Sequence, residues 1–376
     1  MKNRLTILFL FFASSLFAQK DNFYLLTGSY TSGSSKGIYV YRFNTTTGKA
    51  DSVSMVASSN PSFLAVAPNQ QWVYAVNENA NDKGNGGSVS AFAFDKLKGQ
   101  LQFLNSQSSE GNHPCYVTVD QTGHWVIAGN YSSGNFAVLP ILTNGGVAPA
   151  SQVVQQTGKG PDTTRQQSPH VHATFLKKNN HELLVPDLGT DKLFLYQFNA
   201  ATGMATPAAT PFASVQPGAG PRHVTVSNDG KFVYLVTELN GELTVFRDKG
   251  DLKLEAIQSI GTLPAGYNGP FGGADIHLSP DGRFLYSSNR GNANNLAIFS
   301  VNTKTGKLRQ AGFQSTLGIK PRNFSFDPTG KFLLVANQES DDIVIFRVNA
   351  KTGMLKDTGH RIHTGNPVCI KWIPVR

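Results

Sequence analysis

The sequence has 376 residues, with 33 Lys and Arg against 24 Asp and Glu, which gives a formal net charge of +9. The positive residues form no long block, so the basic character does not indicate nucleic-acid binding and instead favours small anionic ligands. The two cysteines, Cys115 and Cys369, are too few to indicate a disulfide-stabilised fold in a chain of this length. We therefore expect a globular protein whose partner is a small molecule.

The first predicted element is a signal peptide over residues 1–18. Two cations precede an apolar run from Leu5 to Phe17, and Ala18 follows as a small residue at the cleavage position. The run is shorter than the roughly 20 apolar residues that a membrane-spanning helix needs. We therefore expect export to the periplasm or the medium, a mature domain over residues 19–376, and no membrane association after the signal peptide is removed.

From residue 61 onward, one phrase recurs about every 50 residues. It joins an alternating apolar segment, a turn rich in Asn, Asp, Gly or Pro, and a second apolar segment. The six copies are PSFLAVAPNQQWVYAVNE, PCYVTVDQTGHWVIAGNY, PHVHATFLKKNNHELLVPDL, PRHVTVSNDGKFVYLVTEL, GADIHLSPDGRFLYSSNR and PRNFSFDPTGKFLLVANQ. A third strand and a fourth, more polar strand follow each copy. Four antiparallel strands in a repeat of this length are typical of β-propeller blades.

The two ends of the chain supply the strands of a seventh blade. The C-terminal segment NPVCIKWI reads as a first strand without a partner, while FYLLTGSYTSGSSKGIYVYRFNTTTGKA and DSVSMVAS near the N-terminus supply strands two, three and four. Joining them closes the ring and removes exposed sheet edges. We therefore predict an all-β, seven-bladed β-propeller in one domain, with the last blade closed by N-terminal strands and a C-terminal strand.

Candidate functional residues lie where the repeats differ from one another. The first two strands of a blade form a hairpin, so Arg222 and His223 at its start lie beside Glu238 at its end, on the rim around the central channel. The equivalent positions read Ser62, Cys115, His170, Arg222, Ala274, Arg322 and Val368 at the starts, and Ser29, Glu78, Tyr131, Asp187, Glu238, Arg290 and Gln338 at the ends. Residue type changes freely between blades at these positions, which is typical of a binding surface. An Asn precedes the end position in four blades and indicates a turn cap.

Two histidines of the third repeat are candidates for acid–base chemistry. His170 and His172 are two residues apart, so both side chains point to the same side of a strand. That arrangement suits proton transfer or a pair of metal ligands. This repeat is one residue longer before its turn than the next, so the sequence leaves open which histidine faces the channel. No further ligands with settled spacing accompany them, so we predict no metal site, and a hydrogen-bonded rim histidine is the alternative.

Glu238 and two arginines complete the candidate set from the repeats. Glu238 stands between Val236 and Leu239, and we expect partial burial to raise its pKa and to suit it to proton transfer. Arg222 and Arg290 offer planar guanidinium groups that match a carboxylate or a phosphate. The alternatives are an ion pair between Glu238 and Arg222, and ordinary surface arginines.

Three phrases carry a resemblance to a known family: GKGPDTTRQQSPHVHATF (158–175), GPRHVTVSNDGKFVYLVTEL (220–239) and GADIHLSPDGRFLYSSNRG (273–291). The chain resembles the lactonases of the seven-bladed bacterial 6-phosphogluconolactonase type, which are related to carboxy-cis,cis-muconate cyclases. The resemblance implies metal-independent hydrolysis of a sugar lactone ester, with acid–base catalysis as the hypothesis for its mechanism. We further expect the lactone to be anionic, no cofactor, and a monomer. With the repeat comparison, the resemblance predicts His172 and Glu238 as catalytic residues and Arg222, Arg290, His170, His223 and Asp187 as substrate-binding residues.

The sequence departs from the family pattern at two positions. Thr237 stands where the family usually has Asn, and Asn292 stands where it usually has His after the NRG motif. Substrate contacts near these positions are open, as are the identity of the lactone and the need for a phosphate on it. Three alternative functions remain: a non-enzymatic exported propeller that binds a ligand or protein partner, a muconate-type cyclase, and a calcium-dependent gluconolactonase-like propeller.

Overall fold

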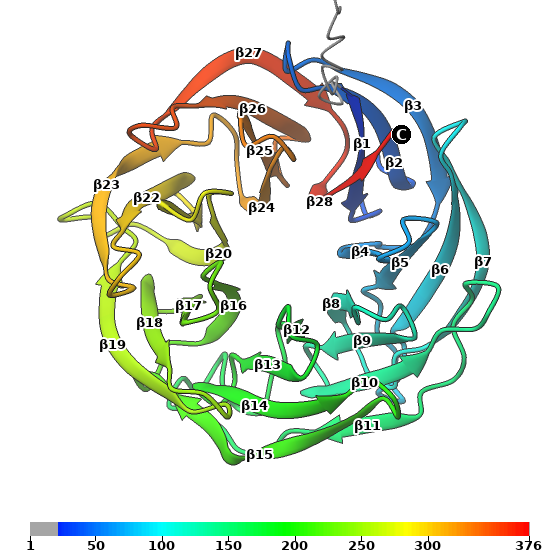
Figure 1. The fold of residues 1–376 in the computed structure, drawn as a ribbon, viewed down its shortest axis with the longest axis horizontal. Helices are drawn as coiled ribbons and strands as arrows, with labels where there is room; N and C mark the ends of the chain where they lie inside the picture. The colour runs from blue at the N-terminus through cyan, green and yellow to red at the C-terminus, as the bar shows by residue number, and fades with distance from the viewer. Residues whose placement is uncertain (1–21, 376) are drawn as a thin grey trace, which may run out of the picture.

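The computed structural model describes residues 22–375, which form seven four-stranded antiparallel sheets arranged in a ring (Figure 1). Every regular element in this range is a β-strand, so it holds no helix that is long and apolar enough to cross a membrane. The prediction of an all-β, seven-bladed β-propeller is confirmed. The predicted signal peptide and its cleavage site at Ala18 lie outside the described residues.

We number the blades in chain order, with strand one of each blade nearest the channel. Blade 1 comprises β4 (Leu64–Val66), β5 (Trp72–Asn77), β6 (Ser88–Asp95) and β7 (Gln100–Ser108), and blade 2 comprises β8 (Pro114–Val119), β9 (Trp125–Asn130), β10 (Asn135–Pro140) and β11 (Gln152–Gln155). Blade 3 comprises β12 (Phe175–Leu176), β13 (Glu182–Asp187), β14 (Lys192–Asn199) and β15 (Met204–Ser214), and blade 4 comprises β16 (Pro221–Val226), β17 (Phe232–Thr237), β18 (Glu242–Asp248) and β19 (Leu254–Gly261). Blade 5 comprises β20 (Phe271–Leu278), β21 (Phe284–Gly291), β22 (Asn295–Val301) and β23 (Leu308–Ser315), and blade 6 comprises β24 (Pro321–Phe326), β25 (Phe332–Asn337), β26 (Asp342–Val348) and β27 (Leu355–His363).

Blade 7 closes the ring as the sequence predicts. Its first strand is β28 (Pro367–Pro374), and the others are β1 (Asn22–Ser29), β2 (Gly37–Asn44) and β3 (Ala50–Ala57). β1 pairs antiparallel with both β28 and β2, and its contact with β28 runs from Phe23 opposite Pro374 to Ser29 opposite Pro367. Both chain ends therefore contribute to one continuous sheet.

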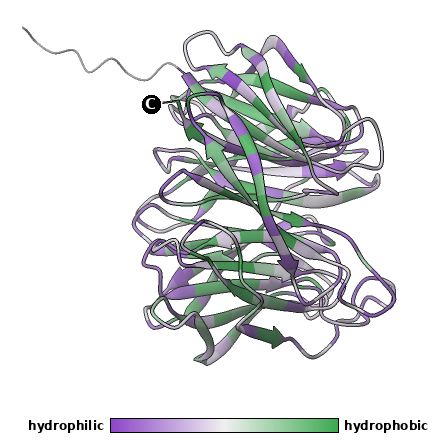
Figure 2. Ribbon diagram, turned by 90° about the vertical axis from the view of Figure 1, so that its right-hand side faces the viewer, coloured by the Kyte–Doolittle hydropathy of each residue, from purple (hydrophilic) through white to green (hydrophobic). Residues whose placement is uncertain are grey.

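The core lies between the faces of neighbouring blades. All six residues of β17 are buried, whereas the outermost strand of the same blade, β19, is partly or fully exposed along its length. Apolar side chains interlock across blade boundaries, as where the rings of Phe43 and Phe332 meet edge to face with their centroids 5.7 Å apart. In the side view, hydrophobic segments follow the strands and alternate with hydrophilic positions (Figure 2).

A β-bulge in the first strand of several blades turns one side chain into the channel. In blade 4, Pro221 pairs with Thr237 and His223 with Val236, which leaves Arg222 as the extra residue. The same shift occurs at Cys115, Arg322 and Val368 in blades 2, 6 and 7. In blade 3, Val171 pairs with Asp187, so His172, rather than His170, takes the place that Arg222 has in blade 4.

The strand pairing also corrects the set of residues that the sequence predicts at the end of the second strand in each blade. The second strands of blades 1, 2 and 6 stop at an Asn, and the next residue donates a backbone hydrogen bond to the segment that leads into strand one. Glu238 makes the same bond to Gly220 after Thr237 in blade 4. In blades 3 and 7 the residues in the place of Glu238 are Leu188, which donates to His170, and Tyr30, which donates to Asn366. The placement of Asp187 and Ser29 in the ring of Glu238 was therefore wrong by one residue. The β-bulges shift the register within the hairpins, and the repeated phrase carries no mark of where they lie.

One blade boundary differs from the other six. At those six, the turn between strands three and four carries a glycine at positive φ that packs on an aromatic ring of the preceding blade; the pairs are Gly48–Phe332, Gly99–Tyr24, Gly145–Trp72, Gly203–Trp125, Gly306–Phe232 and Gly353–Phe284. Between blades 3 and 4, Glu182 replaces the aromatic residue, and Gly250 has no neighbour within 4 Å. Buried Lys177 forms ion pairs with Glu182 and Asp248 there, beside a cavity of about 670 Å³.

Candidate active site

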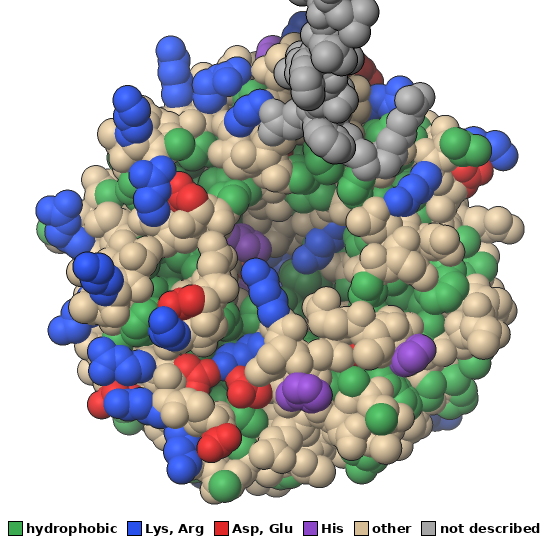
Figure 3. Space-filling view, viewed as in Figure 1, with side chains coloured by type: hydrophobic (Ala, Val, Ile, Leu, Met, Phe, Trp, Pro, Cys, Tyr) green, Lys and Arg blue, Asp and Glu red, His purple; other side chains and the backbone are tan. Residues whose placement is uncertain are grey.

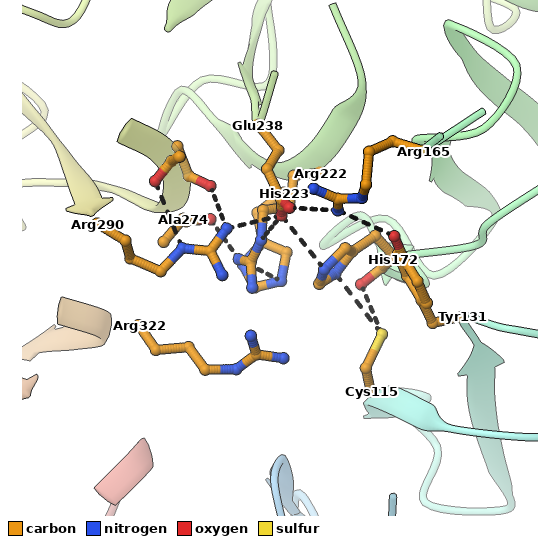
Figure 4. A network of polar contacts seen from close by, with 12 residues as sticks. Cys115, Tyr131, Arg165, His172, Arg222, His223, Glu238, Ala274, Arg290 and Arg322 are labelled. Carbon is orange, nitrogen blue, oxygen red and sulfur yellow. Dashed lines mark hydrogen bonds and ion pairs between the residues drawn. The ribbon is translucent and has the colours of Figure 1, made fainter. Parts of the chain in front are cut away.

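Glu238 is the centre of a polar network on the channel rim (Figure 4). Its side chain is only 8% exposed. Oε1 accepts a hydrogen bond from Arg165 Nη2 at 2.7 Å, and Oε2 contacts Arg222 Nε at 3.0 Å and Arg290 Nη2 at 2.8 Å. Arg222 comes from the same blade, Arg290 from blade 5, and Arg165 from the loop between β11 and β12. Three charge-assisted contacts therefore compensate the burial of one carboxylate.

His172 lies beside this carboxylate. Its Nε2 is 3.9 Å from Glu238 Oε2, and its Nδ1 is 3.6 Å from the Sγ of Cys115. The sulfur also contacts the backbone oxygen of His172 at 3.5 Å, so the thiol can donate there and accept from Nδ1–H. His172 is buried and packs edge to face on Tyr131, with ring centroids 5.3 Å apart. Of the two predicted histidines, it is the one that reaches Glu238.

The other predicted residues have different surroundings. His170 stacks on Tyr131 at 4.5 Å between ring centroids, and its Nδ1 lies 2.9 Å from the backbone oxygen of that tyrosine. Asp187 is fully buried, and its Oδ1 accepts hydrogen bonds from the backbone amides of His170 and Gly189. Asp187 thus occupies the turn-cap position rather than the mouth of the channel.

His223 lies in the channel, next to Arg222. Its Nδ1 is 2.8 Å from Asp275 Oδ1, and its Nε2 is 3.3 Å from Arg222 Nη1. Burial, followed by the charge of Arg222, lowers the pKa of His223 to about 4, although Asp275 opposes the shift. A neutral His223 whose Nε2 accepts from Arg222 fits this geometry. His223 therefore holds the guanidinium group of Arg222 in position.

The expectation that burial raises the pKa of Glu238 is wrong. Burial by itself does raise it, but the nearby charges of Arg290 and Arg222 outweigh that effect, and the pKa lies well below the usual range. His172 shifts in the same direction because burial, followed by the charge of Arg222, disfavours its protonated form. Near neutral pH the site therefore combines a carboxylate and a neutral imidazole.

Two cavities adjoin the network, and the disc is hollowed at its centre, where cationic and histidine side chains are visible (Figure 3). A cavity of about 260 Å³ is lined by Arg165, Glu238, Phe271, Arg290 and Lys320 among others. A much narrower one inside the channel is lined by Ser62, Cys115, Arg222, His223 and Arg322 among others. Over residues 22–375 no group of three or more His, Cys, Asp or Glu is arranged to hold a metal ion.

The sequence model of the family described as "Lactonase, 7-bladed beta-propeller" matches residues 24–372. The chain belongs to this lactonase family. The family resemblance drawn from the sequence is thereby confirmed, and the enzyme class of the family is that of a carboxylic ester hydrolase, as expected.

Relatives of this lactonase-family chain are similar over nearly its whole length. The 6-phosphogluconolactonase of Bacillus subtilis is 35% identical over 349 residues, which is 92% of this chain and 97% of that protein. The 6-phosphogluconolactonase of Formosa agariphila is 35% identical over 85% of this chain and 90% of its own length. The structure of the periplasmic gluconolactonase of Pseudomonas aeruginosa superposes with a TM-score of 0.89 at 37% identity, covering 94% of this chain and all of that one.

The site predicted from the sequence did not include Tyr131, Arg165 or Arg322, which lie close to the predicted residues. Arg165 and Tyr131 contact each other at 3.1 Å through Nη2 and the phenol oxygen, and Arg165 lies in the quoted phrase 158–175 but outside any repeat. Arg322 occupies the same bulge position as Arg222 in the parallel phrases PRN and PRH. The match between these two phrases could have identified Arg322 from the sequence. No feature of the repeat pattern could have identified Arg165.

Proposed function

We propose that the protein hydrolyses an aldonolactone, opening the ring ester to the free acid without a metal ion. The observation that carries this proposal is the contact of one ionised carboxylate, Glu238, with three guanidinium groups and a neutral imidazole at the channel mouth. Membership of the lactonase family supports the reaction class. The names of the relatives, 6-phosphogluconolactonase and gluconolactonase, support a sugar lactone as the substrate.

In the proposed mechanism, His172 is the general base. A separation of 3.9 Å between His172 Nε2 and Glu238 Oε2 lets one water hydrogen-bond to both atoms. The water oxygen attacks the lactone carbonyl carbon while one of its protons passes to Nε2. The bond between that carbon and the ring oxygen then breaks, and His172 returns the proton to the ring oxygen. The product is the open-chain acid.

Arg222 and Arg290 stabilise the oxyanion of the tetrahedral intermediate. Each is fixed by Glu238 and by backbone carbonyls: Arg222 Nη1 donates to Ala274, and Arg290 Nη2 donates to Gly273 at 3.0 Å. Arg222 Nη2 and Arg290 Nη1 have no hydrogen-bond partner among the described residues. Preorganised donors of this kind favour the transition state because they need no rearrangement when charge develops.

We also propose that the protein acts as a monomer outside the cytoplasm. The predicted signal peptide supports export, and so does the periplasmic location in the name of the Pseudomonas aeruginosa relative. Cell fractionation and N-terminal sequencing of the mature protein test the location. A chain that stays in the cytoplasm with Met1 attached would contradict it.

Acid release from a panel of plain and phosphorylated aldonolactones tests the activity. The mature protein, residues 19–376, is assayed with spontaneous opening subtracted, and chelator is expected to leave the rate unchanged. His172→Gln should remove at least about 100-fold of the rate, as for loss of a general base. His363→Gln, which changes an exposed histidine on β27, is the matched control. Full activity in His172→Gln would refute the assignment, and loss of activity with chelator would favour the calcium-dependent alternative.

A further inference from the structure

Arg322 points into the channel mouth from blade 6 and lies apart from Glu238, below Arg290 in the view of Figure 4. It stands at the bulge of β24, as Arg222 stands at the bulge of β16, and both side chains line the same narrow cavity together with His223. The proposed mechanism assigns no role to Arg322, although its side chain is only 15% exposed.

Arg322 differs from the other arginines of the mouth in its bonding. Arg165, Arg222 and Arg290 each donate hydrogen bonds to Glu238, to backbone carbonyls or to Tyr131. Within residues 22–375, Arg322 makes no hydrogen bond. A guanidinium group has five N–H donors, and withdrawing them from water without partners is unfavourable. The group is therefore left for a ligand rich in acceptor oxygens.

Tyr30 and Glu78 hold the guanidinium group of Arg322 in place, but neither forms a close ion pair with it. The guanidinium lies 5.4 Å from the ring centroid of Tyr30, and its Nη2 is 3.9 Å from Glu78 Oε1. Tyr30 donates a hydrogen bond to Glu78 Oε2 at 2.8 Å, which fixes the ring beneath the guanidinium. Tyr30 and Glu78 follow strand two in blades 7 and 1, in the same ring position as Glu238.

Gln338, in the same blade as Arg322, also has a polar atom that lacks a hydrogen-bond partner among the described residues. The position that Glu238 holds in blade 4 is taken in blade 6 by Gln338, whose amide also donates to the residue before strand one. The Oε1 atom of Gln338 is buried and has no hydrogen-bond partner within the described part of the chain. Blade 6 thus repeats the arginine of blade 4 but not its carboxylate, so Arg322 has no ion-pair partner like Glu238 in its own blade.

The charge at the mouth points to a permanent anion on the ligand. Four guanidinium groups, those of Arg165, Arg222, Arg290 and Arg322, face three carboxylates, those of Glu238, Glu78 and, through His223, Asp275. Glu238 lies within hydrogen-bond distance of the other three arginines, whereas the carboxylate paired with Arg322 is Glu78, at 3.9 Å. The charge of Arg322 is therefore the least closely neutralised of the four.

We propose that Arg322 binds an anionic substituent of the lactone, a phosphate ester or a carboxylate, in a subsite formed by blades 6, 7 and 1. Tyr30 and Glu78 position the guanidinium for this contact. The lactone ring then lies with its carbonyl toward His172 and its anionic end toward Arg322. This inference rests on the proposed lactone hydrolysis.

The test compares three lactones with wild-type protein, Arg322→Gln and Arg322→Lys. The substrates are 6-phosphogluconolactone, glucarolactone with a free carboxylate, and neutral gluconolactone. We expect Arg322→Gln to lower kcat/KM about 10- to 100-fold for the anionic lactone that the wild type prefers, with less than about 3-fold change for the neutral one. Arg322→Lys should recover part of the loss because it keeps the charge but not the planar fork. Arg309→Gln, on the outer strand β23, is the control for a lost surface charge.

A binding measurement separates this inference from the proposed function. Calorimetric titration with 6-phosphogluconate and with glucarate, which have no ring to open, is expected to show at least about 10-fold weaker binding of the preferred anion by Arg322→Gln. If the wild type hydrolyses lactones but Arg322→Gln slows neutral and anionic ones equally, the subsite is refuted and the proposed function stands. If no lactone is hydrolysed, weaker anion binding by the variant still supports the subsite. Equal binding by both refutes it.

Discussion

Glu238 is a buried side chain whose neighbours decide its chemistry. A carboxylate between apolar residues invites the expectation of a raised pKa, yet three arginines keep it ionised. Two of these, Arg222 and Arg290, were predictable because each occupies a repeat position that differs between blades. Arg165 was not, because it comes from a long connection that has no counterpart in the other blades. Local sequence therefore predicted the place of the carboxylate but not its charge state.

Replacement of Glu238 by Gln tests the electrostatic role of the carboxylate. The variant keeps the shape of the side chain but leaves Arg165, Arg222 and Arg290 to repel one another. Removal of one partner from a buried ion pair costs about 3–5 kcal/mol, and we expect a loss of that order in the free energy of unfolding. Urea denaturation measures it. Glu255→Gln, half exposed on β19, is the control, and equal stability of the two variants would contradict the argument.

The low pKa of His172 predicts the pH dependence of lactone opening. The imidazole acts as a base only when neutral, so activity is present above its pKa and is lost as the pH falls through that value. Because burial lowers the pKa well below 6.5, kcat/KM should be level through neutral pH and fall only in more acidic solution. An inflection near pH 6.5 that disappears in His172→Gln would show an ordinary imidazole and contradict this picture.

At the scale of strands, the hairpin repeat predicted correctly which side chains share a rim. It gave the wrong position for the end of strand two in two blades. Asp187 and Ser29 were placed one residue too early, because the second strands of blades 3 and 7 end without the Asn that marks blades 1, 2 and 6. The bulges that turn Arg222 and His172 into the channel also leave no mark in an alternating apolar pattern. They depend on how strand one meets strand two, and pairing of this kind is a property of the sheet.

The glycine turns between strands three and four provide a test of packing between blades. Gly203 has φ +73 and packs on the ring of Trp125, whereas Gly250 has φ +85 and no neighbour within 4 Å. Both Ala variants suffer the strain of positive φ, about 1–2 kcal/mol. Gly203→Ala should lose about 1–3 kcal/mol more because its Cβ collides with the indole. Thermal or urea unfolding measures the difference, and equal losses would show that the ring adapts without cost.

For the whole molecule, the repeat and the two end fragments were sufficient to predict seven blades and the strand that closes them. This succeeded because each blade is a local unit, and among the described strands only one pairing, that of β28 with β1, joins distant parts of the sequence. The positions of the charged groups across the channel depend on the diameter of the closed ring. For that reason the contact of Arg322 in blade 6 with Glu78 in blade 1, two blade positions around the ring, could not be predicted.

The closing strand can be tested by moving it. A chain that stops at Asn366 lacks β28, and we expect it to lose cooperative unfolding and to aggregate because β1 has an unpaired edge. Pro374 pairs beside Phe23, so residues 367–374 joined by a short glycine linker to Asn22 should re-form the same hairpin. That permuted chain should recover a single melting transition by circular dichroism. A cooperative melt in the shortened chain would refute the need for closure.

The pairing of β1 with β28 also has a consequence for the order of events in the cell. On the ribosome, β1 emerges long before the strand that covers it, so the nascent polypeptide cannot complete its ring during translation. Among the described strands, β28 is the last to be synthesised. This order is compatible with the export proposed above, because a chain whose ring is still open can be threaded through a narrow pore.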